Sequence, residues 1–144
     1  MKNILFILVF VLASASCKNE TKPSKEITIS KAEKVTPKLD PNNYNVAFLI
    51  MDGTYNTELT APFDIFQHTF FREGIKAMNV FTVANTNDPI TTFEGMRILP
   101  DFNYLTHDLP KIDILVVPSA ENHLGKDLED EAMINFVKQI DKEA

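Results

Sequence analysis

The sequence has little of the residues that most often carry chemistry or cross-link a fold. It contains one cysteine, three histidines and no tryptophan in 144 residues. A single cysteine excludes a disulfide within the chain. His68 and His107 fall on different predicted elements without the spacing of metal ligands, so neither a metal nor another cofactor is expected. The length suits one domain rather than two.

Positive charge is scarce in most of the chain. Residues 18–38 carry a net charge of +3, whereas residues 40–144 carry a net charge of −10. Phosphate binding needs a basic face, so the acidic body argues against a nucleic-acid partner. The basic stretch is best interpreted as a solvated tether, with a weaker alternative in which it lies near anionic lipid.

The first 17 residues have the pattern of an export signal. Lys2 precedes an unbroken apolar run from Ile4 to Ala13. Ten residues are too few to span a bilayer, which takes about 20, but they suit the core of a secretory signal. Small residues then lead to Cys17, and this segment resembles the lipobox of bacterial lipoproteins, although Ser14 stands where a larger aliphatic residue is usual. The resemblance implies cleavage after residue 16, lipid on Cys17 and a location in the bacterial cell envelope, facing the periplasm or the cell surface. An ordinary signal peptide cut near Ala15, leaving Cys17 as a free thiol, is the alternative.

A linker is predicted over residues 17–43. It is rich in Lys, Glu, Thr, Ser and Pro, and its few aliphatic residues are too sparse to form a core. Pro37 and Pro41 discourage regular structure near its end. The folded domain is therefore expected from Tyr44 to the last residue.

Alternating strand and helix signals follow Tyr44. The apolar run 44–51 predicts a strand buried on both faces, and Thr57 is a candidate N-cap for a helix that places Leu59, Phe63, Phe66 and Phe70 on one face. Further strands are expected at 80–84 and 112–117, a hairpin at 90–99, and a last helix at about 127–142. This pattern predicts an α/β fold whose ligands bind where the strands end, in the loops after Met51 and Val117.

Four segments resemble, in order, the ThiJ/PfpI superfamily, whose domain is flavodoxin-like and related to class I glutamine amidotransferases. These are the first strand 46–51, the helix start 57–66, the segment 93–101 with its Gly-Met-Arg and Pro-Asp, and the strand 113–118. The resemblance implies a parallel sheet with flanking helices. It also implies an incomplete domain, because the family's nucleophile strand would follow residue 144.

The same resemblance assigns roles to three positions. Glu58 matches the carboxylate that hydrogen-bonds the family's cysteine, and Ser119 and Ala120 occupy the place of a Gly-Gly oxyanion loop. Non-glycine residues resist positive φ, so that loop is expected to differ from the family's. No cysteine follows Cys17, so the family's thiolate chemistry is absent from these residues. A first-turn acid that only complements the helix dipole is the alternative for Glu58. His123 is expected to be a polar loop residue.

Two functions remain open from the sequence. One is the front portion of an exported ThiJ/PfpI-like protein related to cysteine-dependent hydrolases, isonitrile hydratases and amidotransferase-like domains, inactive as it stands. The other is a non-catalytic envelope lipoprotein that binds a small molecule or a protein. A homodimer and a complementing C-terminal segment are both compatible with either function.

Overall fold

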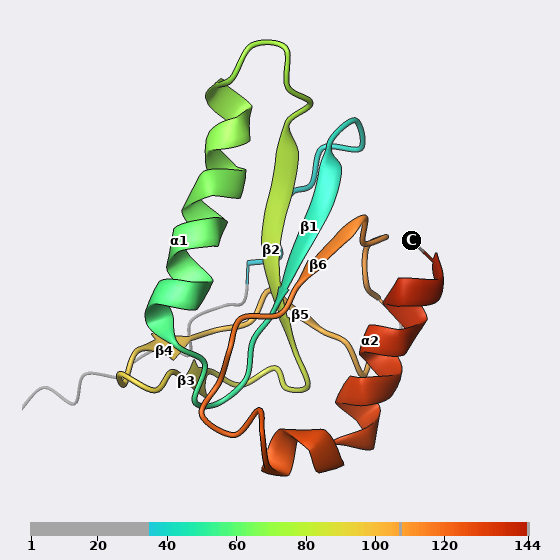
Figure 1. Ribbon diagram of the computed structural model, residues 1–144. Coiled ribbons are helices and arrows are strands. Elements are labelled where there is room, and N and C mark those ends of the chain that lie inside the picture. Colours follow the sequence, from blue (N-terminus) through green and yellow to red (C-terminus); the bar gives the residue numbers. More distant parts are fainter. Residues whose placement is uncertain (1–34, 107, 144) are drawn as a thin grey trace, which may run out of the picture. The chain divides into compact units, whose positions relative to one another are not determined.

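A computed structural model describes residues 35–106 and 108–143 (Figure 1). Cys17, the apolar run before it and His107 lie outside the described residues. A four-stranded parallel sheet has the order β5-β2-β1-β6, and a separate antiparallel hairpin joins β3 to β4. The strands are β1 (Tyr44–Leu49), β2 (Met78–Ala84), β3 (Ile90–Thr91), β4 (Arg97–Ile98), β5 (Phe102–Asn103) and β6 (Ile114–Val116). The predicted flavodoxin-like sheet with flanking helices is confirmed.

The central strand β1 is buried on both faces because its side chains serve two hydrophobic clusters. Val46 and Phe48 pack with Leu59 on the side of α1 (Asn56–Gln67). Ala47 and Leu49 pack with Phe136 on the side of α2 (Glu131–Glu143). Alternate residues of a strand point to opposite faces, so the continuous apolar run becomes the middle layer of an α/β/α sandwich.

Helix α1 differs from its prediction at both ends. It begins at Asn56, and its N-cap is Tyr55 rather than Thr57. Glu58 does lie in the first turn. Phe63 and Phe66 pack against the ring of Phe48 (centroid distances 5.2 and 6.0 Å).

The predicted apolar face does not extend to Phe70. The α-helix ends at Gln67, and a 3₁₀ turn follows over His68–Phe71. Because a 3₁₀ turn has fewer residues per turn, the angle between successive side chains changes, and Phe70 is 69% exposed. The prediction that Phe70 belongs to the apolar face of this helix is therefore wrong.

The C-terminal helix begins later than expected. Lys126–Glu129 form a 3₁₀ turn, and α2 starts at Glu131 after Asp130, whose carboxylate accepts the amide of Met133 at 2.9 Å. Aspartate at this position satisfies an amide that the first helical turn leaves free. Phe136 is buried, and its ring stacks on Tyr104 at 4.6 Å.

The predicted hairpin forms, and the Pro-Asp segment after it is held to the sheet. One carboxylate oxygen of Asp101 accepts both the amide (2.7 Å) and the hydroxyl (2.9 Å) of Thr82. The Thr82 hydroxyl in turn accepts the amide of Asp101 at 3.0 Å. This closed set of bonds fixes the start of β5 beside β2.

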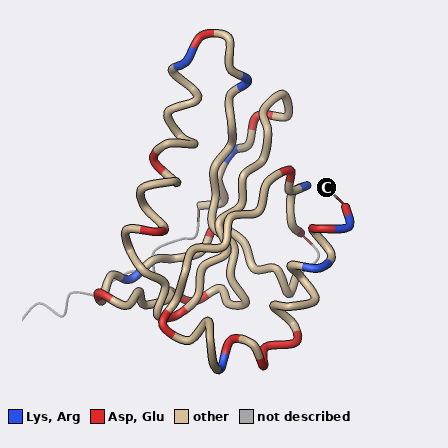
Figure 2. Tube along the Cα trace, viewed as in Figure 1, with Lys and Arg blue, Asp and Glu red and all other residues tan. Residues whose placement is uncertain are grey.

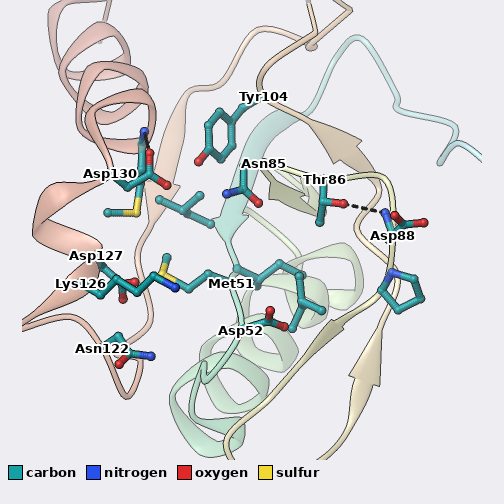
Figure 3. A pocket seen from close by; sticks show the side chains of 15 residues that line it. Met51, Asp52, Asn85, Thr86, Asp88, Tyr104, Asn122, Lys126, Asp127 and Asp130 are labelled. Atoms are coloured by element: carbon teal, nitrogen blue, oxygen red, sulfur yellow. Dashed lines mark hydrogen bonds between the residues drawn. The ribbon is translucent and has the colours of Figure 1, made fainter.

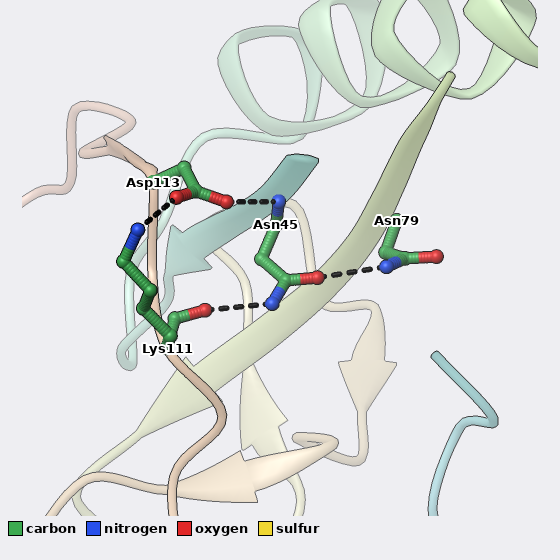
Figure 4. Close-up of polar contacts among 4 residues, drawn as sticks. All are labelled: Asn45, Asn79, Lys111 and Asp113. Carbon is green, nitrogen blue, oxygen red and sulfur yellow. Dashed lines mark hydrogen bonds and ion pairs between the residues drawn. The ribbon is translucent and has the colours of Figure 1, made fainter. Parts of the chain in front are cut away.

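A polar network ties together the amino ends of the strands (Figure 4). The Asn45 amide group donates to the carbonyl of Lys111 (2.7 Å) and accepts from Asn79 (2.7 Å). Asp113 accepts the backbone amide of Asn45 at 2.9 Å and pairs with the Lys111 ammonium at 2.8 Å. Asn79 also bonds the backbone of Asp40, so residues just before β1 are held to the sheet. Leu39 packs against the α2-side cluster, a contact that the linker composition did not predict.

The two edges of the described sheet are unequal. At one edge β5 has only two residues. At the other, β6 is flanked by Val117, which is 45% exposed. Among the helices of the described ranges, none has both the length and the hydrophobicity needed to cross a bilayer.

Candidate functional site

Three loops meet at the carboxyl ends of the strands. The loop after β1 joins the loop after β6 through bonds from the Tyr55 amide to the Ser119 carbonyl and from the Glu121 amide to the Gly53 carbonyl, both 3.0 Å. It joins the β3–β4 hairpin through the Gly53 amide to the Thr91 carbonyl at 2.8 Å. The loops after Met51 and Val117, in which the sequence analysis places ligand binding, thus lie side by side.

Gly53 is the position where this junction requires glycine. Its φ is +81°, a conformation that other residues rarely adopt. A Cβ built there would lie 3.0 Å from the Cβ of Glu121. The close approach of the two loops therefore depends on the missing side chain.

Glu58 and Ser119 are brought together across 61 positions of sequence. The Glu58 carboxylate accepts the Ser119 backbone amide at 3.0 Å. Hydrogen bonding from Ser119, by its side chain first and then by its amide, lowers the pKa of Glu58 from its ordinary value of 4.5, and the charge of His123 adds a smaller effect in the same direction. Glu58 is therefore an anion at neutral pH that can accept hydrogen bonds or take up a proton, but cannot donate one.

The other two candidate positions adopt ordinary backbone conformations. In the described part of the chain no residue except glycine has positive φ, so Ser119 and Ala120 do not reproduce a glycine-type turn. The Ser119 amide is already bonded to Glu58. Ala120 is buried, and it forms an isolated bridge with Thr54. A loop of this form offers a developing oxyanion fewer amides than a Gly-Gly turn with both amides free.

The sequence predicted that His123 is a polar loop residue. In the structure its charge also lowers the pKa of Glu58. It is half-buried, and its amide donates to the Ala120 carbonyl at 3.2 Å. A lone histidine in a loop gives no sequence signal of this proximity. The described residues contain no group of three or more potential ligands placed to hold a metal ion.

A cavity of about 410 Å³ lies beside these loops, between the ends of β1 and β2 and the start of α2 (Figure 3). Asp52 and Asn85 line it from the strand ends, and Asp127, Asp130 and Lys126 line it from the turn before α2. Figure 2 shows acidic residues along this end of the described residues. The position is one where parallel α/β sheets commonly bind ligands.

Tyr104 closes one side of this cavity. Burial first, and then the negative charge of Asp130, raise the pKa of Tyr104 to about 12. Its phenol therefore remains protonated and available as a hydrogen-bond donor through the physiological range. The sequence predicted neither the cavity nor this contact, because both depend on the path of the chain between β5 and α2.

Comparison with known proteins gives the family. A model of the DJ-1/PfpI family matches residues 44–144. Comparison with the curated proteins gave no match. Among solved structures, a DJ-1 superfamily protein from Salmonella typhimurium, in mutant form, is 17% identical with a TM-score of 0.54, over 69% of this chain and 50% of that one.

Two further structures agree in fold. A protein from Vibrio parahaemolyticus, described as a proposed transcriptional regulator, is 18% identical with a TM-score of 0.57, over 71% of this chain and 53% of that one. A two-domain protein from Anabaena variabilis, with DJ-1/ThiJ/PfpI-like and ferritin-like domains, is 18% identical with a TM-score of 0.52 over 70% of this chain and 27% of that one. This chain thus spans about half the length of the first two. On the match over residues 44–144 and this shared fold, the chain belongs to the DJ-1/PfpI family.

Proposed function

We propose that this chain is the front portion of an exported DJ-1/PfpI-type protein related to cysteine-dependent hydrolases, isonitrile hydratases and amidotransferase-like domains. In this proposal it carries the family's acid and loop but is catalytically inactive as it stands. The observation that carries the proposal is the hydrogen bond from the Ser119 amide to Glu58, which joins the two loops where a reacting group would sit.

The chemistry of these loops supports a binding or orienting role. An ionised carboxylate beside a thiol can accept its proton or hold a water molecule. The sequence supplies no thiol after Cys17, so Glu58 has no nucleophile to activate within these 144 residues. The amide that would stabilise an oxyanion is also bonded to Glu58.

Turnover assays test the inactive state. The full chain, with Cys17 alkylated, is expected to give no hydration of an alkyl isonitrile and no hydrolysis of glutamine above the rate without protein. A matched Glu58→Gln variant is also expected to give no rate above that without protein. Turnover that survives alkylation and is lost in Glu58→Gln would contradict the proposal.

The proposed location is a bacterial envelope membrane, through lipid on Cys17. The apolar run 4–13 followed by small residues and Cys17 supports it. Intact mass and detergent phase partitioning of the native protein, compared with Cys17→Ser, test it. Lipid should add mass to the wild type and carry it into the detergent phase. An unmodified Cys17 thiol in the mature protein would show an ordinary signal peptide instead.

A second candidate function is a non-catalytic lipoprotein that binds a small molecule. The cavity beside Tyr104 favours it, since it combines carboxylates, amides and a neutral phenol with apolar walls. Native mass spectrometry of the full chain should then show a retained small molecule. Met133→Trp, which fills the cavity, should abolish retention, whereas the same change at exposed Leu124 should not.

A further inference from the structure

The segment that joins α1 to β2 holds apolar side chains in solvent. Phe71 is 77% exposed, and Phe70 and Ile75 are also exposed. The rings of Phe70 and Phe71 contact each other edge to face, with 5.6 Å between their centres, instead of packing into either hydrophobic cluster. The Met78 amide donates to the Thr69 hydroxyl at 3.1 Å, which holds the segment to the start of β2. A group of apolar side chains fixed at the surface indicates an interaction site.

We call residues 68–77 the tip. It lies at the amino ends of β1 and β2, whereas the three-loop junction lies at their carboxyl ends (Figure 1). The Tyr44 amide donates to the Ala77 carbonyl at 3.2 Å, so the tip ends where β1 begins. A Cβ built on Gly74 would have no atom beyond its chain neighbours within 4 Å, which means that the turn reaches into open space. The apolar side chains are therefore carried on a projection rather than on a flat face.

The charge of the tip differs from that of the rest of the domain. Arg72 and Lys76 outweigh Glu73, for a net charge of +1, whereas residues 40–144 carry −10 (Figure 2). The Lys76 ammonium lies 3.9 Å from the centre of the Tyr44 ring, at the base of the tip. Apolar side chains flanked by cations suit a surface that is both apolar and anionic, which describes a bilayer containing anionic lipid.

The chain enters the domain beside the tip. A cavity of about 280 Å³ is lined by Pro37 and Asn43 from the segment before β1 and by Phe70 from the tip. The 20 residues from 18 to 37 span at most about 70 Å. A lipid on Cys17 would therefore attach to the domain at the end that carries the tip.

We infer that the tip inserts into the surface of an anionic bilayer. Phe70, Phe71 and Ile75 enter the boundary of the acyl chains, and the Arg72 and Lys76 cations lie beside the lipid phosphates. The inference rests on the proposed lipid anchor, because a surface this small needs the high local concentration that a tether gives. With the tip in the bilayer, the three-loop junction faces the aqueous compartment, one length of β2 away, roughly 23 Å for its seven residues.

The absence of tryptophan from the sequence allows a direct test, since a single introduced tryptophan reports its own depth. Phe71→Trp places it in the tip, and Leu124→Trp, at a 97% exposed leucine at the other end of the strands, is the matched control. The full chain is expressed with its signal, and the mature protein is reconstituted into vesicles of phosphatidylethanolamine and phosphatidylglycerol. Quenching by brominated acyl chains should be at least three times greater in Phe71→Trp than in Leu124→Trp.

Two additional variants keep the test decisive. Reversing both charges in the Phe71→Trp background, with Arg72→Glu and Lys76→Glu, should at least halve the quenching. Ile75→Trp replaces Phe71→Trp if that variant fails to fold.

The intact mass of each sample separates the inference from the anchor on which it rests. Equal quenching at the two positions, or no quenching in the tip, would overturn the inference, even in a sample whose mass shows lipid on Cys17. Tip quenching in a sample whose mass shows no lipid would support the inference and refute the anchor. A tip shielded from the bilayer by a second copy of the chain would also give no quenching there, and would likewise overturn the inference.

Discussion

The bonds between Asp101 and Thr82 allow a quantitative test of how the Pro-Asp segment contributes to the fold. Thr82 is only 7% exposed, and both its amide and its hydroxyl donate to one oxygen of Asp101. Replacing Asp101 with alanine leaves two buried donors without acceptors. Leaving a buried donor without an acceptor costs about 1–3 kcal/mol. Because Asp101 is half-buried, water can supply part of the missing hydrogen bonding. We expect Asp101→Ala to lower the free energy of unfolding by about 3 kcal/mol.

Asparagine separates charge from shape at this position. Asp101→Asn retains a carbonyl oxygen that can accept both donors but loses the charge, so the expected cost is about 1 kcal/mol. For a domain of this size, about 1 kcal/mol corresponds to a change in melting temperature of roughly 4–8 °C. Thr82→Val removes the hydroxyl from the other side of the same set of bonds.

Urea denaturation followed by far-ultraviolet circular dichroism is the assay. The double variant Thr82→Val/Asp101→Ala should lose clearly less stability than the sum of the two single variants, because both changes break the same bonds. Additive losses, or a cost below about 0.5 kcal/mol for Asp101→Ala, would refute the reasoning and leave the Pro-Asp segment without the structural role described above.

Three further predictions concern single positions. In urea denaturation, Gly53→Val should lower the free energy of unfolding by about 2 kcal/mol or more. Gly74→Val, which also lies at positive φ but in open space, should lower it less. Equal losses would argue against the close contact between the loops. The hydrogen bond from Lys111, followed by that from the Asn45 amide, lowers the pKa of Asp113. The ionised Asp113 therefore stabilises the fold fully above its ordinary pKa of 3.8, and this stabilisation is lost as pH falls through the lower pKa of the folded state. The difference in unfolding free energy between wild type and Asp113→Asn should narrow only below about pH 4, and a difference that widens there would be contrary evidence. Because the pKa of Tyr104 is raised, the protonated phenol stabilises the fold fully below its ordinary pKa of 10.0, and this stabilisation is lost as pH rises through about 12. Ultraviolet titration should show one tyrosine that ionises near pH 12 and is missing from Tyr104→Phe. Absence of such a step in the wild type would contradict this.

The sequence predicted best those elements whose pattern is local. The apolar run 44–51 and the hairpin around Phe93-Glu94-Gly95 formed strands close to their expected positions, whereas the run 112–117 gave only the three-residue strand β6. The helix boundaries were less accurate, since Tyr55 serves as the N-cap without a capping side chain and a 3₁₀ turn ends the apolar face before Phe70.

The candidate site was predictable only in part. Glu58 and Ser119 were singled out from the family resemblance, and the structure places them in contact. The proximity of His123, the cavity beside Tyr104 and the network around Asn45 and Asn79 were not predicted. These contacts join residues that are far apart in sequence and carry no distinctive spacing, so they follow from topology rather than from any local pattern.

Main-chain hydrogen bonds make up a large part of the junction of the three loops, with Tyr55 donating to Ser119, Gly53 to Thr91 and Phe93 to Thr54. Alanine scanning would consequently underestimate its importance, because truncating a side chain leaves those bonds in place. Hydrogen exchange of the individual amides would reveal it instead, with slow exchange at Gly53, Tyr55 and Phe93. The same property leaves room for sequence drift: side chains around the loops can be replaced while the backbone frame that orients them is kept.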